Sequence, residues 1–266
     1  MAMSTTTWGV GDYPRMAVEL ESVSVAAVAS VPIRPGLRVL DVAAGTGNAS
    51  LMAAKKGAVV TGVDIEPVLI EIAKERATTA ASNVRWLIGD CEQLPVPDGS
   101  VDVVFSIFGV MYASDHLAAA WELDRVTAQG GRVVLASWRP GSVMPAMGHV
   151  LSSFLPPPPP SSGPPSRWGD AEALGDILQP THLSLEGTST GQVTLSFSDA
   201  AEGASFLIAT AGHVVSERDR LEGLGAWEAL HQELTQFVQE RCAPGVGDGG
   251  GITLSLDYLL ATALKE

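Results

Sequence analysis

The stretch "VLDVAAGTGNAS", residues 39–50, decides the fold of this chain. It opens as a short apolar strand that carries one acid, Asp41, and continues into a turn that contains Gly45 and Gly47. A strand that leads through a glycine-rich turn into a helix presents backbone N–H groups to a bound ligand. The stretch therefore predicts the first strand of a ligand-binding α/β sheet.

The sequence on the C-terminal side continues an alternation of strands and helices. The expected strands are residues 38–43, 58–65, 84–90, 101–108 and 132–138, and the expected helices are residues 46–57, 67–81 and 115–128. Such alternation implies right-handed crossovers and a mostly parallel sheet. Ligands of these sheets bind at the carboxyl ends of the strands.

Segments outside this alternation have a different character. Residues 16–30 have the apolar spacing of an amphipathic helix, as do residues 217–241. Residues 183–198 are expected to form a strand or a hairpin, and residues 252–266 a last strand. The stretch 139–170 is rich in proline and includes the run Pro156–Pro160, which indicates either a loop packed on the core or a lid over a substrate.

Composition narrows the possible partners and compartments. The chain of 266 residues has 30 acids against 16 bases, a formal net charge of −14, which disfavours nucleic acids and anionic membranes as partners. Its two cysteines cannot build a disulfide framework. The apolar run at residues 23–33 follows acids instead of a basic segment and is too short to span a bilayer. We therefore expect a soluble, cytoplasmic protein.

The glycine turn suits some ligands better than others. A phosphate-binding P-loop is excluded, because no Gly-Lys-Ser/Thr follows the first glycine. Residues 45–50 match G-x-G-x-x-S, and Asp64 stands where the ribose-binding acid of a dinucleotide site belongs, so a nicotinamide cofactor remains an alternative. Asp41 argues against it, since a carboxylate about 4 Å from a phosphate costs about 4 kcal/mol at an effective dielectric constant of 20.

Acids recur at the ends of the expected strands. Asp41, Asp64 and Asp90 hold the same relation to three successive strands, so their carboxylates should line one crevice. Such a crevice suits S-adenosylmethionine, which carries an amino cation, a sulfonium, ribose hydroxyls and an exocyclic amine. Ile65 and Cys91 offer apolar faces for the adenine ring.

These motifs together resemble the class I S-adenosylmethionine-dependent methyltransferases that act on small molecules. The resemblance covers about residues 37–140 and rests on "VLDVAAGTGNAS", "GVDIEP", "GDCEQLPVPDGSVDVVFSIFGVMYASDH" and "ELDRVTAQGGRVVLASWRP". It implies an α/β, Rossmann-like, seven-stranded and mostly parallel sheet with helical and loop lid insertions. The chain would then be one domain, 1–266, with an N-terminal helical lid at 1–35, the cofactor-binding core at 37–140, a proline-rich lid at 141–170 and a helical insertion at 199–250.

The resemblance also implies roles for individual residues. Asp41, Ala43, Gly45 and Gly47 would lie near the methionine moiety, Asp64 at the ribose, Asp90 and Cys91 at the adenine, and Ser106 beside the sulfonium, while Trp8 and Tyr13 would fold over the cofactor. Ala43 replaces a glycine that is common in the family. This replacement is tolerable if the residue has a negative φ.

The candidates for catalysis are fewer. Methyl transfer needs aligned reactants and a dry site, and it needs a general base only if the nucleophile must lose a proton. His116 lies just beyond the strand that ends near Ser106, and Tyr112 and His213 are further candidates for orienting a substrate or moving a proton. No acid cluster with metal-ligand spacing is evident, so we expect no metal requirement.

The expected acceptor is a small, largely apolar organic molecule, and the product of the cofactor is S-adenosylhomocysteine. This expectation rests on the acidic composition and on apolar residues outside the core alternation, namely Met144, Met147, Phe154, Phe206 and Ile208. Three other functions remain alternatives: a cyclase or other non-methylating catalyst with the cofactor as a structural prop, a nicotinamide-dependent oxidoreductase, and a binding protein without turnover. We expect a monomer or a homodimer.

Overall fold

The computed structural model describes residues 7–245 and 250–266, which form two compact units. The larger unit contains Leu20–Pro140, Pro159–Gly191 and Tyr258–Glu266, and the smaller unit contains residues 7–19, Gly141–Pro158, 192–245 and 250–257. The expected core, residues 37–140, lies entirely in the larger unit.

The strands form one sheet in the order β3-β2-β1-β4-β5-β8-β6. Their bounds are β1 (Arg38–Val42), β2 (Val59–Asp64), β3 (Val84–Ile88), β4 (Val101–Ile107), β5 (Thr127–Trp138), β6 (Leu183–Phe197) and β8 (Ile252–Lys265). The pairings among β1 to β5 are parallel, and β8 pairs antiparallel with β5. This arrangement confirms the Rossmann-like, mostly parallel sheet, and the short strand β7 (Ala243–Pro244) beside β8 brings the total to eight where seven were expected.

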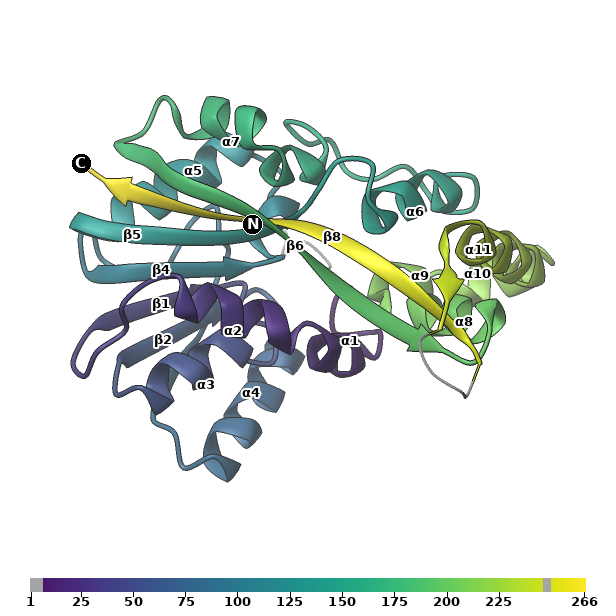
Figure 1. Cartoon of the computed structure of the whole chain (residues 1–266), viewed down its shortest axis with the longest axis horizontal. Coiled ribbons are helices and arrows are strands. Elements are labelled where there is room, and N and C mark those ends of the chain that lie inside the picture. Colours follow the sequence, from purple (N-terminus) through teal and green to yellow (C-terminus); the bar gives the residue numbers. More distant parts are fainter. Residues whose placement is uncertain (1–6, 246–249) are drawn as a thin grey trace. The chain divides into compact units, whose positions relative to one another are not determined.

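Helices cover the sheet of the larger unit. The helices are α2 (Glu21–Ala29), α3 (Asn48–Lys55), α4 (Pro67–Thr79), α5 (His116–Val126) and α7 (Ala171–Leu178). In Figure 1, α2 and α3 lie together beside β1 and β2, and α5 and α7 lie together by β5. Fully buried Val39, Phe105 and Val134 pack with Ala27 and Ala53 of the first pair of helices. This packing fixes the carboxyl ends of β1 and β4 relative to the start of α3.

The smaller unit is mainly helical. Its helices are α1 (Tyr13–Glu19), α6 (Val143–Leu151), α8 (Ala200–Thr210), α9 (Gly212–Val215), α10 (Arg218–Gly223) and α11 (Trp227–Arg241). Helix α8 packs on α11 and α1 packs on α8. Met147, Phe206 and Ile208, expected to face a substrate from a lid, are each less than 9% exposed.

Several local expectations need correction. The helix expected at 16–30 is two helices, because Leu20 (φ −84°, ψ 0°) interrupts it between α1 and α2. The helix expected at 217–241 is also two, since Gly225 has a φ of +68° between α10 and α11. Residues 183–197 form one strand and not a hairpin. In the described part of the chain, no helix combines the length and apolar character that crossing a bilayer requires.

Candidate active site

The glycine turn after β1 is held from two sides. Gly45 and Gly47 have positive φ values, +54° and +86°, which glycine adopts without steric cost. Arg76 of α4 donates from Nη1 to the carbonyl oxygen of Thr46 at 2.6 Å and to Oδ1 of Asn48 at 2.8 Å. No local sequence pattern indicates this role of Arg76, because the guanidinium reaches a turn about thirty residues away in the chain.

Trp86 of β3 supports the same turn. A Cβ atom at Gly47 would lie 2.6 Å from the Trp86 ring, and one at Gly62 of β2 would lie 2.3 Å from it. The two glycines therefore leave the space that the indole fills. The turn is thus shaped by side chains of α4 and β3 before any ligand binds.

Asp41 belongs to β1, and its buried side chain lies against the first turn of α3. Its Oδ2 atom accepts hydrogen bonds from the backbone N of Ser50 at 2.9 Å and from Ser50 Oγ at 2.7 Å. Burial, with a smaller contribution from the charge of Asp64, raises the pKa of Asp41 to about 6, although the hydrogen bonds from Ser50 act to lower it. The carboxylate therefore ties the first turn of α3 to β1, and it keeps a negative charge beside the glycine turn at neutral pH.

This raised pKa predicts a pH dependence of stability. A carboxyl whose pKa is raised in the folded state contributes stability that is present below pH 4 and is lost as the pH rises through about 6. A rise of about two pKa units corresponds to about 3 kcal/mol. Urea unfolding between pH 4 and 7 should show the wild-type protein losing about that much free energy of unfolding relative to Asp41→Asn. Parallel pH curves for the two proteins would contradict this assignment.

Asp64 and Glu66 lie at the end of β2. The Oδ2 atom of Asp64 accepts from the backbone N of Gly45 at 2.7 Å, and Oδ1 accepts from the backbone N of Glu66 at 2.9 Å. Burial raises the pKa of Asp64, and the charge of Glu66 raises it further. Glu66 is 6% exposed, and its Oε1 atom has no hydrogen-bond partner among the described residues. The site thus contains a carboxylate oxygen that is ready to accept a hydrogen bond, which the sequence analysis missed.

The residues after β3 form the next part of the crevice edge. Asp90 is exposed, and one of its oxygens accepts from the backbone N of Glu92 at 2.9 Å. Burial, with the charges of Asp90 and Glu92, raises the pKa of the Cys91 thiol to about 12, so it behaves as an apolar group. Ile65, at the neighbouring strand end, is half-buried. These positions are compatible with the expected adenine contacts.

Ser106 lies at the carboxyl end of β4, and its expected place beside the sulfonium remains a prediction. Its hydroxyl is fully buried, donates to the carbonyl oxygen of Val42 at 2.9 Å and accepts from the backbone N of Val110 at 2.9 Å. The first bond holds the carboxyl ends of β1 and β4 together, and the second fixes the turn that follows β4. Ser106 therefore shapes the site through the backbone around it.

Ala43 does not meet the condition under which its replacement of glycine is tolerable. Its φ is +55°, in the left-handed region, where a Cβ atom crowds the backbone. Gly109 lies against it, since a Cβ atom at Gly109 would be 2.4 Å from the Ala43 Cβ. Ala43 therefore carries local strain.

Replacing this alanine should stabilise the protein. Ala43→Gly removes the cost of about 1–2 kcal/mol that a left-handed conformation imposes on alanine. Glycine in turn loses more conformational entropy on folding, which offsets a smaller part of this gain. We expect the free energy of unfolding to rise by about 1 kcal/mol. Urea denaturation measures this free energy of unfolding. Ala44→Gly is the control, because Ala44 has no positive φ to relieve. An unchanged or lower stability in Ala43→Gly would show that the strain is absent in solution.

An aromatic cluster lies beyond β4. Phe108 has a φ of +54°, an unusual conformation for a bulky residue. Its ring stacks on Trp138 with centroids 3.6 Å apart and meets Tyr258 edge-on at 6.0 Å. Tyr112 forms a side-chain hydrogen bond with Trp138, and burial of its hydroxyl raises its pKa to about 12. Backbone strain beside a binding crevice is often retained for function, which makes this cluster a candidate wall for a substrate.

His116 begins α5 and is 2% exposed. Its ring meets Trp168 edge-on with centroids 5.8 Å apart, and neither ring nitrogen has a hydrogen-bond partner in the described part of the chain. Burial and the charge of Arg167 lower its pKa, and Asp115 opposes them. The imidazole is therefore neutral at pH 7, with a nitrogen lone pair that can accept a proton.

Part of the proline-rich segment is docked on α5. Ser162 donates from its backbone N to the carbonyl oxygen of Ser114 at 2.8 Å, and its Oγ accepts from the backbone N of His116 at 2.7 Å. Gly169 packs so closely on β5 that a Cβ atom there would lie 1.9 Å from the carbonyl oxygen of Trp138. Residues 162–169 are therefore a packed part of the larger unit.

Three expected site residues lie in the smaller unit. Trp8 meets the exposed His213 ring edge-on at 6.5 Å, and Tyr13 begins α1. Asp12 donates from its backbone N to the carbonyl oxygen of Ala209 at 2.8 Å, so the N-terminal segment is anchored on the end of α8. The expected contacts of Trp8 and Tyr13 with the cofactor, and the expected catalytic role of His213, remain predictions.

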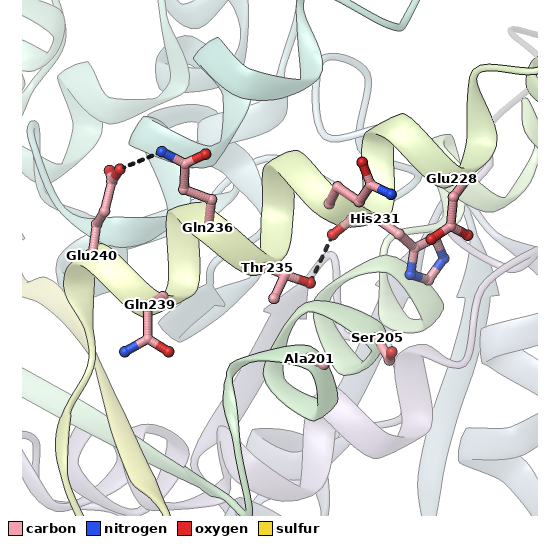
Figure 2. A pocket seen from close by; sticks show the side chains of 9 residues that line it. Ala201, Ser205, Glu228, His231, Thr235, Gln236, Gln239 and Glu240 are labelled. Atoms are coloured by element: carbon pink, nitrogen blue, oxygen red, sulfur yellow. Dashed lines mark hydrogen bonds between the residues drawn. The ribbon is translucent and has the colours of Figure 1, made fainter.

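The smaller unit also has a pocket of its own, between α8 and α11. Figure 2 shows His231 and Thr235 of α11 on the side that faces Ser205 of α8. Its volume is about 700 Å³, and it is lined by Ala201, Ser205, Glu228, His231, Gln232, Thr235, Gln236, Gln239 and Glu240. Five of these nine residues are glutamine or glutamate. In residues 7–245 and 250–266, no three His, Cys, Asp or Glu side chains group as a metal site.

Comparisons with known proteins agree with this geometry. A methyltransferase-domain family matches residues 40–135. An uncharacterised protein of Mycobacterium tuberculosis is 34% identical over 261 residues, 97% of this chain and 93% of that protein. Demethylmenaquinone methyltransferase of Thermus thermophilus is 41% identical over 105 residues, 39% of this chain and 48% of that enzyme. The crystal structure of the YcgJ protein from Bacillus subtilis matches with a TM-score of 0.65 at 17% identity, covering 92% of this chain and 98% of that one.

The sheet order and the glycine turn after β1 are those of a Rossmann-like α/β fold. The chain belongs to the class I S-adenosylmethionine-dependent methyltransferases.

Proposed function

We propose that this protein transfers a methyl group from S-adenosylmethionine to a small, largely apolar organic acceptor. The observation that carries the proposal is the group of buried carboxylates Asp41, Asp64 and Glu66 beside the glycine turn. Buried carboxylates attract a cation and accept hydrogen bonds from hydroxyls, and they repel the phosphates of a dinucleotide. The unpartnered Oε1 of Glu66 fits such a hydroxyl-rich ligand.

Residues of the larger unit would hold the cofactor. The turn at Gly45 and Gly47 would receive its amino acid end, Asp64 and Glu66 its ribose hydroxyls, and Asp90 its adenine amine. When bound, S-adenosylmethionine supplies a methyl group made electrophilic by the sulfonium. The protein's own task is then to align the acceptor with that methyl group and to exclude water.

The acceptor would lie against the aromatic cluster of Phe108, Trp138 and Tyr258. These rings offer an apolar wall at the carboxyl ends of β4 and β5. For an acceptor that reacts through a hydroxyl, we propose that a ring nitrogen of His116 takes the proton, with its neutral form favoured by burial. Tyr112, beside Trp138, would orient the acceptor.

Ligand-induced stabilisation tests the cofactor. S-adenosylhomocysteine at a hundredfold excess over its dissociation constant should raise the free energy of unfolding by about 2.7 kcal/mol. Thermal unfolding with S-adenosylhomocysteine, and with NAD as the matched control, measures this effect. Stabilisation by NAD with none by S-adenosylhomocysteine would overturn the proposal. Mass spectrometry of molecules that co-purify with the protein, followed by incubation with S-adenosylmethionine, tests for a methylated product.

A further inference from the structure

Strand β6 forms one end of the sheet. Among the described residues it neighbours β8 on one side, and no strand follows it in the sheet order. Residues 186–190 are exposed one after another, so both faces of this part of the strand are open to solvent. A Cβ atom placed at Gly187 would meet no atom within 4 Å. The outer backbone edge of β6 is therefore accessible over its middle.

This edge lacks the features that usually prevent strands from pairing between molecules. Exposed edge strands are normally interrupted by proline, lysine, a bulge or an inward charge. Residues 183–197, "LSLEGTSTGQVTLSF", contain no proline or lysine and a single charged residue, Glu186. Arg132 of β5 pairs with Glu186 through two hydrogen bonds, at 2.7 and 2.9 Å. In a chain of net charge −14, this edge thus carries no uncompensated charge.

The sequence of β6 is nearly symmetric about Ser189. Reading outward from this residue, the chain gives Thr188 and Thr190, Gly187 and Gly191, Glu186 and Gln192, Leu185 and Val193, Ser184 and Thr194, and Leu183 and Leu195. The two residues of each pair are similar in character, and only Glu186 and Gln192 differ in charge. If a second copy of the strand lies antiparallel about Ser189, each residue therefore faces one of similar character.

We infer that two copies of this chain pair through their β6 strands, antiparallel, with a twofold axis at Ser189. Each threonine beside the axis then faces a threonine of the other copy, and each Glu186 faces a glutamine, so no like charges oppose one another. The pairing also keeps buried side chains on one face of the extended sheet and exposed side chains on the other. Leu183, Val193 and Leu195 are buried on one face of β6, and the threonines of the other face are exposed. Pairing extends the sheet from one copy into the other in an isologous dimer.

Charged substitutions at the two threonines beside the twofold axis test the pairing. Sedimentation velocity of the wild-type protein should show a species of twice the 27.6 kDa chain mass that grows with concentration. The double variant Thr188→Lys/Thr190→Lys sets lysines opposite lysines and should return the mass to that of one chain. The matched variant Thr188→Glu/Thr190→Lys sets glutamate opposite lysine and should remain dimeric. A monomeric wild type, or equal loss of dimer in both double variants, would overturn the inference.

Cross-linking fixes the register independently. Ser189→Cys places two thiols opposite each other across the axis and should yield a disulfide-linked dimer on mild oxidation, mapped to residue 189 by peptide mass spectrometry. Thr194→Cys on the same strand faces residue 184 of the other copy and should not link to itself. Circular dichroism and thermal unfolding confirm that each variant is folded. A dimer that links through position 194 as readily as through position 189 would contradict the register.

Discussion

Asp64→Ala is expected to weaken binding of S-adenosylhomocysteine at least a hundredfold. The variant removes the proposed acceptor of the ribose hydroxyls, and it also removes the oxygen that receives the backbone N–H of Gly45 at 2.7 Å. Hydrogen bonds to a charged group contribute about 1.5–3 kcal/mol each, so the loss of those from the two ribose hydroxyls corresponds to a hundredfold or more. Isothermal titration calorimetry measures the dissociation constant.

Two further variants separate these effects. Asp64→Asn keeps an oxygen that can accept from Gly45 and should bind more tightly than Asp64→Ala. Asp98→Ala removes an exposed acid that lies just before the amino end of β4, and it should leave the dissociation constant unchanged. Circular dichroism checks that each variant remains folded, because Asp64 also accepts from the backbone N–H groups of Gly45 and Glu66. An unchanged dissociation constant in Asp64→Ala would remove this residue from the ribose site.

His116→Ala is expected to lower turnover at least a hundredfold if the acceptor is a hydroxyl. A positioned general base contributes about 10²–10⁴-fold, and the ring nitrogens of His116 have no partner in the described residues that would occupy them. Affinity for S-adenosylhomocysteine should change less than about threefold, because the proton acceptor is not a proposed cofactor contact. Steady-state kinetics and calorimetry provide the two measurements.

The pH profile and a volume-conserving variant distinguish a proton acceptor from a packing residue. Burial and Arg167 lower the pKa of His116, so the acidic limb of the wild-type profile should lie below pH 6.5. His116→Phe retains the contact with Trp168 but accepts no proton, and it should be as inactive as His116→Ala. His182→Ala alters a largely exposed histidine paired with Asp124 and should leave turnover unchanged. Full activity in His116→Phe would assign His116 to packing.

The sheet was predictable because its signals are local. Apolar runs of strand length, glycine turns and Pro67 at the start of α4 each depend on a few neighbouring residues. The same holds for the acids at strand ends, whose shared edge follows from parallel topology. The interruptions at Leu20 and Gly225 were missed, because the apolar periodicity continues across them although the helical backbone conformation ends there.

The supporting contacts of the site were not predictable in this way. Arg76 reaches the glycine turn, and Trp86 fills the space left by Gly47 and Gly62, only after the crossovers have brought distant segments together. Glu66 carries a local signal, an acid two residues after Asp64, but a charged residue at a helix start is ordinarily solvated. Its burial depends on tertiary packing.

The left-handed Ala43 also limits how this sequence can change during evolution. A methyl group at position 109 would collide with the Ala43 Cβ at 2.4 Å, whereas with glycine at position 43 its nearest neighbours are Ser106 Oγ at 3.0 Å and the carbonyl oxygen of Val42 at 3.1 Å, which are tight contacts and not collisions. Gly109→Ala should therefore be tolerated better after Ala43→Gly than before it. The order of the two substitutions then decides whether the intermediate sequence folds, so one alanine makes a neighbouring glycine appear invariant among descendants of this protein.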